Sequence, residues 1–535
     1  MDTSAQRRQF LKSAAAAGLV LPGMSIWQQA FAADAAKKLD LGKKHKFSFD
    51  ALTERARKMA GKPYVAPKTP DKAILEQIDY AEHGKLKYKR DFAPFSDGSG
   101  TYPVTYFHMG QFFQKPVHMY LLENGMSQEV EYRTDYFDMP ANSPARKLSE
   151  NIGFAGFRLH ENIKRDDWKT QDWAAFLGAS YFRAIGDEGQ YGLSARGIAI
   201  NTATPQGEEF PDFTEFYIEP AKSAEDPVTV YALLDGPSIT GAYRFYLTRG
   251  KGVMMDVEKF LFIRKDIERF GVAPLTSMFW YSEQNRPFRM DWRPEVHDSD
   301  GLALWTGGGE RIWRQLNNPE ITRASAFGDD NPRGFGLMQR DRDVTHYLDG
   351  VMYHRRPSLW VEPLGAWGKG AVQLVEIPTD DEIHDNIAAF WVPEAPTKAG
   401  QSYHFRYRLY WQAHTPYPLE KLAHVKATRL GRGGQEGLPR PKGLTKFVID
   451  FEGDILGTLA YGEYPEAIIS VSRGKLSRIK TEPIPDTRLW RAMFDLDVDG
   501  NNPVDMRMYL KRGDAPLSET WMYQHLPGLK NWDEK

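Results

Sequence analysis

The feature that most limits the fold of this sequence is a long series of short β-type runs between about residues 102 and 412. Aromatic and β-branched residues form runs such as Tyr231–Gly236, Val253–Val257 and Phe405–Tyr410, and Gly, Pro, Asn and Asp residues interrupt them. Long helical patterns do not separate these runs, whereas a parallel α/β sheet needs a helix between successive strands. The pattern predicts an all-β protein built on one large antiparallel β-sandwich.

The flanking segments predict the remaining domain organisation of this 535-residue chain. Helical periodicity predicts helices over Phe49–Ala60 and over residues 71–82 at the start of the large sandwich, which we expect over residues 33–412. A Gly- and Arg-rich stretch near residues 431–441 predicts a linker over residues 413–440. Regular alternation of apolar and polar residues then predicts a small immunoglobulin-like β-sandwich over residues 441–535.

The first 32 residues have the pattern of an export signal. Arg7 and Arg8 precede Phe10-Leu11-Lys12, and the apolar run that follows is too short to span a bilayer. A small-x-small cleavage site follows at Ala30-Phe31-Ala32, so the pattern predicts a twin-arginine signal over residues 1–32 and a periplasmic mature protein. The alternative is an amphipathic N-terminal segment that does not act as an export signal. No later stretch approaches 18 apolar residues, so we expect no membrane span in the mature chain.

Composition and motifs exclude several classes of function. The net charge is −2 without a long basic run, which argues against nucleic acid as a partner. The absence of cysteine excludes disulfides, thiolate metal sites and cysteine nucleophiles. Asp495–Gly500 begins like a calcium loop, but Met506 stands where the bidentate Glu belongs, and no zinc spacing of histidines occurs. We therefore expect neither a metal nor an organic cofactor.

Two acidic segments are the strongest polar features. Residues 380–386 carry four carboxylates within six positions, and residues 295–300 carry a second group. Either segment alone is more often a solvated turn than a site.

Sugars combine apolar faces with hydroxyl rims, so aromatic, guanidinium and carboxylate side chains suit a glycan cleft. Core packing is the alternative for each of the substrate-binding residues that we predict on this basis: Tyr181, Arg183, Asp300, Arg356 and Trp360.

Longer strings give a specific resemblance that covers about residues 47–524. The strings are Phe154–Arg158, Phe176–Arg183, Tyr191–Gly197, Glu209–Phe213, Ser238–Tyr243, Asn331–Gly336, Arg356–Pro363, Pro503–Leu510 and Ser518–Trp521. The sequence resembles the family of periplasmic glucans biosynthesis proteins G and D, and its twin-arginine signal is similar to that of the D branch. The resemblance implies a galactose-mutarotase-like N-terminal sandwich with a long cleft, a short linker and an immunoglobulin-like C-terminal sandwich.

The resemblance also implies a function on the β-1,2-linked glucose backbone of osmoregulated periplasmic glucans. Some members are similar to inverting endo-β-1,2-glucanases, and related members transfer the chain instead of hydrolysing it. The family's catalytic carboxylates correspond to Asp385, Asp298 and Glu382, and either aspartate of the pair can be the acid. The prediction is therefore an inverting endo-β-1,2-glucanase. The alternatives are a cyclising transglycosylase and a non-catalytic glucan-binding factor that works with membrane-bound glucan synthesis machinery.

Overall fold

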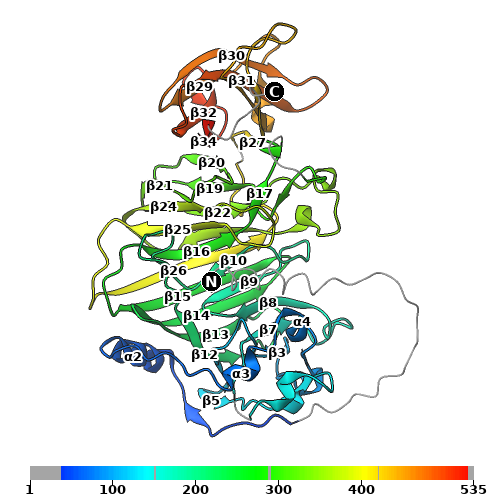
Figure 1. Ribbon diagram of the computed structural model, residues 1–535, viewed down its shortest axis with the longest axis vertical. Helices are drawn as coiled ribbons and strands as arrows, with labels where there is room; N and C mark the ends of the chain where they lie inside the picture. The colour runs from blue at the N-terminus through cyan, green and yellow to red at the C-terminus, as the bar shows by residue number, and fades with distance from the viewer. Residues whose placement is uncertain (1–37, 150–151, 287–290, 420, 528–535) are drawn as a thin grey trace, which may run out of the picture.

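The computed structural model describes residues 38–149, 152–286, 291–419 and 421–527 and has an all-β fold, as predicted (Figure 1). The predicted signal over residues 1–32 lies outside this range. Across the described ranges, every helix is too short or too polar to cross a bilayer.

Of the two helices predicted before the large sandwich, one is confirmed and the other is wrong. Helix α2 spans Phe49–Ala60 as predicted: the Ser48 hydroxyl accepts a hydrogen bond from the Ala51 amide at 3.1 Å and caps its N-terminus. The single helix predicted over residues 71–82 is wrong. The structure has two short helices, α3 (Lys72–Leu75) and α4 (Tyr80–His83), because the Asp79 carboxylate accepts from the Glu82 amide at 2.8 Å and starts a new helix there.

Two large sheets form the body of the protein (Figure 1). The first sheet has the order β1 (His45–Lys46), β5 (Met126–Glu129), β4 (His118–Glu123), β12 (Asp212–Glu219), β13 (Val228–Asp235), β14 (Ile239–Arg249), β15 (Val253–Ile263), β26 (Ser402–Gln412), β23 (Ser358–Pro363), β22 (Gly334–Met338), β19 (Gly301–Trp305), β20 (Arg311–Gln315), β34 (Thr520–His525), β32 (Val504–Arg512) and β29 (Glu466–Val471), with β33 (Ala515–Pro516) beside β32. The second sheet has the order β21 (Arg323–Asp330), β24 (Lys369–Glu376), β25 (Ile387–Pro393), β16 (Phe270–Ser277), β10 (Ser194–Arg196), β9 (Tyr181–Ala184), β8 (Asp172–Leu177), β7 (Gly156–His160) and β3 (Val104–Phe107), with β11 (Ala199–Ile200) beside β16.

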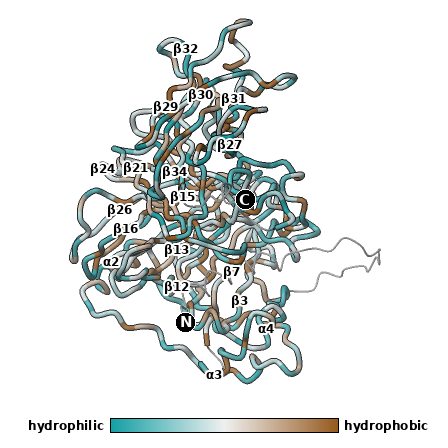
Figure 2. The backbone as a smooth tube through the Cα atoms, turned by 45° about the horizontal axis from the view of Figure 1, so that its top comes forward, coloured by the Kyte–Doolittle hydropathy of each residue, from teal (hydrophilic) through white to brown (hydrophobic). Residues whose placement is uncertain are grey.

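The main core lies between these sheets. Phe182 of β9 contacts Phe245 of β14 at 5.3 Å between ring centroids and Trp411 of β26 at 6.2 Å. Residues of β15 alternate between buried and half-buried positions, as one face of a sandwich strand requires. In Figure 2 the hydrophilic colour follows the outer loops, whereas hydrophobic segments concentrate along strands of the body.

The C-terminal part is joined to the first sheet. Strand β34 pairs in parallel with β20, with Ile312 opposite Thr520, so this sheet continues into the C-terminal sandwich. The opposing sheet there has the order β27 (His424–Arg432), β28 (Leu444–Glu452), β31 (Leu489–Asp497) and β30 (Lys475–Pro483). Strand β27 lies within the range predicted as linker, so regular structure begins earlier than the composition indicated.

Candidate functional site

The loops that carry the two predicted catalytic aspartates are anchored to two adjacent residues, Met278 and Phe279. The Asp298 amide donates to the Met278 carbonyl at 2.8 Å, just after the fully buried strand β16. The side chain of Asn386, next to Asp385, accepts from the Phe279 amide at 2.8 Å and donates to its carbonyl at 2.9 Å. Phe279 begins the small strand β17 (Phe279–Tyr281), which pairs with β18 (Val296–His297). The backbone thus brings both loops to one point.

Asp298 is held by a half-buried arginine. Its Oδ1 forms an ion pair with the Arg356 guanidinium, and the two side chains are 1% and 15% exposed. The Arg356 guanidinium carbon lies 4.4 Å from the Tyr353 ring centroid. Burial acts to lower the pKa of Arg356, but the charge of Asp298 and the contribution of Tyr353 outweigh it and raise that pKa. Arg356 therefore stays charged and orients the Asp298 carboxylate.

Glu382 joins this group through Tyr353. The Tyr353 hydroxyl donates to Glu382 Oε2 at 2.6 Å, and Arg293 Nη1 donates to the same oxygen at 2.7 Å. Arg293 also contacts Asp291 at 2.9 Å and Asp349 at 3.0 Å, so one guanidinium gathers three carboxylates. Burial raises the pKa of Tyr353, which keeps its hydroxyl protonated as a hydrogen-bond donor.

Asp385 is 8% exposed on the loop between β24 and β25 and lies within electrostatic range of Arg183. Burial lowers the pKa of Arg183, and the charge of Asp385 acts in the opposite direction. The Arg183 guanidinium carbon lies 4.9 Å from the Tyr191 ring centroid. Tyr181 is on the same side of β9 as Arg183, 5% exposed, with the Arg196 guanidinium carbon 5.1 Å from its ring centroid.

The other predicted binding residues, Trp360 and Asp300, lie elsewhere. Trp360 is 2% exposed and belongs to the second hydrophobic core, with Trp313 and Trp521. Both Asp300 oxygens accept from the backbone amide of Arg340. Asp300 lines a cavity of about 290 Å³ between the large sandwich and β27, away from the ion pair of Asp298. The binding roles of Trp360 and Asp300 stay predictions, and their surroundings favour packing and loop anchoring.

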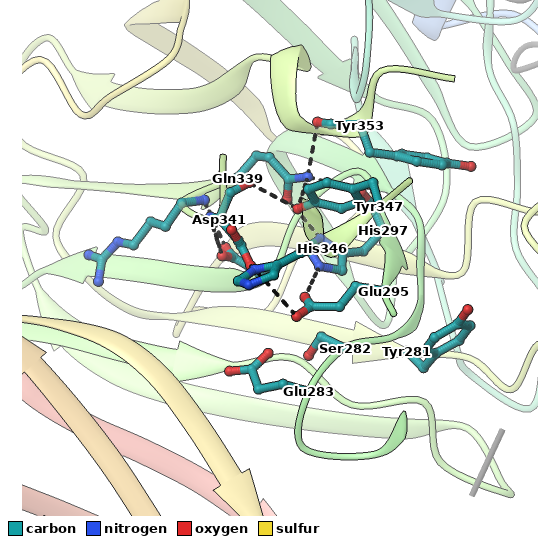
Figure 3. A network of polar contacts seen from close by, with 12 residues as sticks. Tyr281, Ser282, Glu283, Glu295, His297, Gln339, Asp341, His346, Tyr347 and Tyr353 are labelled. Carbon is teal, nitrogen blue, oxygen red and sulfur yellow. Dashed lines mark hydrogen bonds and ion pairs between the residues drawn. The ribbon is translucent and has the colours of Figure 1, made fainter. Parts of the chain in front are cut away.

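A buried polar network supports the loop of Asp298 (Figure 3). His297 Nε2 lies 2.9 Å from Glu295 Oε2, and Nδ1 lies 2.8 Å from Gln339 Oε1. The Gln339 amide nitrogen contacts the carbonyls of His297 and Tyr353 and the Tyr347 hydroxyl, which fixes its oxygen toward the imidazole. Both ring nitrogens of His297 therefore face acceptors, an arrangement that an imidazolium satisfies.

The electrostatics agree with this protonation state. Burial acts to lower the pKa of His297, but its hydrogen bond and charge interaction with Glu295, together with the charges of Asp300 and Asp341, raise it to about 9. On the cavity side, the hydrogen bond to Asp341 at 2.5 Å raises the pKa of His346 to about 9. Burial and the charge of Glu295 raise the pKa of Glu283 to about 8.

Three residues of this network have the chemistry of metal ligands. Glu295, Asp341 and His346 place ligand-type atoms within 4.8 Å of one another. In the structure His346 already donates to Asp341, and His297 already donates to Glu295, so hydrogen bonds satisfy this group. The expectation that the protein uses no metal stays a prediction.

Sequence analysis missed Tyr353, Arg293 and Gln339. Tyr353 had a local signal, because it lies three residues before Arg356 in Tyr353-His-Arg-Arg356. Arg293 and Gln339 had none, because their partners come from distant segments: Glu382 lies 89 residues from Arg293, and His297 lies 42 residues from Gln339. The assembled group of acids, guanidinium ions and a tyrosine can bind hydroxyl-rich ligands and move protons.

Comparison with known proteins shows the family of this chain. The family model described as "Periplasmic glucan biosynthesis protein, MdoG" matches residues 47–525. The chain is 56% identical over 528 residues to "Glucans biosynthesis protein D 2" of Ralstonia nicotianae, covering 97% of this chain and 98% of that protein. It is 47% identical to "Glucans biosynthesis protein D" of Xanthomonas campestris pv. campestris, covering 98% of each chain. It is 45% identical to the protein of that name of Xylella fastidiosa, again covering 98% of each chain. The chain therefore belongs to the MdoG family of periplasmic glucan biosynthesis proteins.

Proposed function

We propose that this protein is a periplasmic endo-β-1,2-glucanase that sets the backbone length of periplasmic glucans by inverting hydrolysis, with Asp385 and Asp298 as the catalytic carboxylates. The observation that carries the proposal is that Asp298 and Asn386, which follows Asp385, are both anchored to Met278–Phe279. Family membership supports the glucan as substrate. Export by the twin-arginine pathway is part of the proposal.

Inverting hydrolysis needs two groups on opposite faces of the scissile bond. One carboxylic acid protonates the glycosidic oxygen, while the other carboxylate removes a proton from the attacking water, directly or through a sugar hydroxyl. Arg356 keeps Asp298 oriented, and Arg183 supplies a positive charge near Asp385. Glu382, held by Tyr353 and Arg293, is a positioning residue in this scheme.

The test is to incubate the purified mature protein with linear β-1,2-glucan and to follow chain length. We expect shorter linear products, and a decrease in kcat of about 10²-fold or more for Asp385→Asn and for Asp298→Asn, because each loses a proton carrier while keeping its shape. Asp380→Asn is the matched control, since Asp380 is an exposed carboxylate of the same loop. Its kcat should stay within about 2-fold of wild type because surface substitutions away from the site change little.

Other products would replace the proposal. Cyclic or longer glucans would identify a transglycosylase, in which a sugar hydroxyl takes the position of the attacking water. Binding of the glucan without any change in chain length would identify a non-catalytic assembly factor. Cleavage at wild-type rate by Asp385→Asn would show that this residue is not part of the catalytic pair.

A further inference from the structure

A second cavity lies on the second sheet and is strongly basic. It has a volume of about 580 Å³ and lies among α4, β2 (Lys87–Tyr88), β3, β7 and β8. Figure 1 shows α4, β3, β7 and β8 side by side. Five basic residues line it: Lys85, Lys87, Arg90, Arg158 and Lys169. Among its described lining residues, Asp172 is the only carboxylate. The chain as a whole has a net charge of −2, so this excess of positive charge is local.

Two carboxylates in the described part of the chain lie near these cations: Glu82 pairs with Lys85 at 3.0 Å, and Asp172 lies near Arg158 and Arg90. Arg90 donates to backbone carbonyls, those of Lys169 at 2.7 Å and Tyr88 at 2.8 Å. Arg158 lies over the Phe107 ring and reaches Asp172 only at 3.6 Å. Within the described ranges of the chain, the structure gives Lys87 no ion pair.

Repulsion among these cations acts to lower the pKa of neighbouring basic groups. Burial lowers the pKa of Lys87, and the charges of Arg158 and Arg90 lower it further. Burial also lowers the pKa of His83 to about 4, and Arg158 and Lys87 act in the same direction. Bringing like charges together costs free energy, which a bound anion would recover.

This cavity lies near Arg183 of the site described above. The strand register places Arg158 opposite Ala175 and Ala175 opposite Arg183, so both arginines lie on the same face of the second sheet. The Arg183 guanidinium lies over the Tyr191 ring, and the Tyr191 hydroxyl donates to Asp172 of the cavity at 2.8 Å. A sugar chain near Asp385 and Arg183 could therefore place a neighbouring residue in the basic cavity.

We propose that this cavity binds an anionic group, a phosphate ester or a carboxylate, carried by a glucose residue of the glucan in the cleft. That the ligand is a glucan rests on the proposed function, whereas the binding of an anion rests on the cavity alone. A concave, solvent-open cavity of this size suits a single substituted sugar and does not suit a flat membrane surface. Arginine is the usual partner of phosphate and carboxylate because its planar group donates two parallel hydrogen bonds.

The test compares three linear β-1,2-glucans of equal length: unmodified, chemically succinylated, and acetylated to the same degree as a neutral control. Calorimetric titration at low salt uses Asp385→Asn as the background of every protein, so that the chains are not cleaved. The succinylated chain should bind this protein about 10-fold more tightly than the acetylated chain, the effect of one charged hydrogen bond. The double variant with Lys87→Gln and Arg158→Gln should bring this ratio close to one. Lys475→Gln, on the exposed strand β30, is the control and should keep the ratio.

Two results would overturn the proposal: equal binding of the two modified chains by the Asp385→Asn protein, or an unchanged ratio when Lys87→Gln and Arg158→Gln are added to it. If the double variant does not fold, Lys87→Gln alone should still lower the ratio by about 3-fold, and an unchanged ratio there would also overturn the proposal. Titration with inorganic phosphate separates the two proposals. Suppose that phosphate binds, that the cavity substitutions abolish this binding, and that no glucan binds. The anion site would then stand, and the proposed glucan function would be rejected.

Discussion

Replacing His297 by Gln removes a buried positive charge from the residue before Asp298. His297 is 0% exposed, and its pKa is about 9 in the folded protein against 6.5 for the free side chain. A raised pKa contributes stability that is fully present below pH 6.5 and is lost as the pH rises through 9. One pKa unit corresponds to about 1.4 kcal/mol, so the protonation of His297 contributes about 3 kcal/mol at pH 6 and almost none at pH 10.

The measurement is the free energy of unfolding in urea for wild type and His297→Gln at several pH values between 6 and 10. We expect the destabilisation caused by the substitution to shrink by about 3 kcal/mol across this range. The difference between the two proteins is the relevant quantity, because other groups also titrate. His346 acts in the same direction, whereas Lys259, whose pKa burial lowers to about 7, adds stability as the pH rises.

A destabilisation that is the same at pH 6 and pH 10 would refute the assignment of an imidazolium. The groups that face His297 are Glu295, Gln339, Asp300, Asp341 and Tyr347. The variant Gln339→Glu is a second check, because a carboxylate in place of the amide should raise the pKa of His297 further. A fall in that pKa, followed by nuclear magnetic resonance of the imidazole, would contradict the geometry.

Three further predictions follow from the site and its surroundings. Trp360→Ala should lower the free energy of unfolding by about 3–5 kcal/mol, because Trp360 fills the second core; unchanged stability in urea together with lost glucan binding would instead place it in the cleft. Arg356→Met should cost about 3–5 kcal/mol and abolish glucan cleavage, since Asp298 would stay buried without its partner, and Arg356→Lys should recover part of both. Dialysis against EDTA should leave glucan cleavage unchanged; a loss that one divalent ion restores would assign a metal to Glu295, Asp341 and His346.

The parts of the fold that local sequence determines could be predicted. Helix α2 has its N-cap Ser48, acidic Asp50 in the first turn and basic residues in the last turn, so its bounds follow from neighbouring residues. Alternation along Val504–Leu510 likewise matches the buried and exposed positions of β32. The break between α3 and α4 was missed because Asp79 can occupy a helix interior or cap a new helix, and its hydrogen bond to the Glu82 amide decides between them.

The candidate site could be predicted only in part. Asp298, Glu382 and Asp385 could be predicted as candidates because they lie in acidic loops that match the family, and Arg356 because it stands next to aromatic residues. Trp360 belongs to the same string as Arg356, but the strand β23 turns its side chain toward the second core. Burial of this kind depends on which sheet face meets another domain, and the sequence around Trp360 carries no sign of it.

The most direct test of the central claim is the anomeric form of the first product from linear β-1,2-glucan, followed by nuclear magnetic resonance within minutes of mixing. Inversion by two carboxylates acting on opposite faces converts the β-linkage into an α-anomeric reducing end before mutarotation mixes the anomers. The account predicts that the α signal appears first with wild type and with Asp380→Asn, and that it appears about 10²-fold more slowly or not at all with Asp385→Asn and Asp298→Asn. A β signal that appears first would indicate a retaining mechanism and would contradict the roles proposed for Asp385 and Asp298.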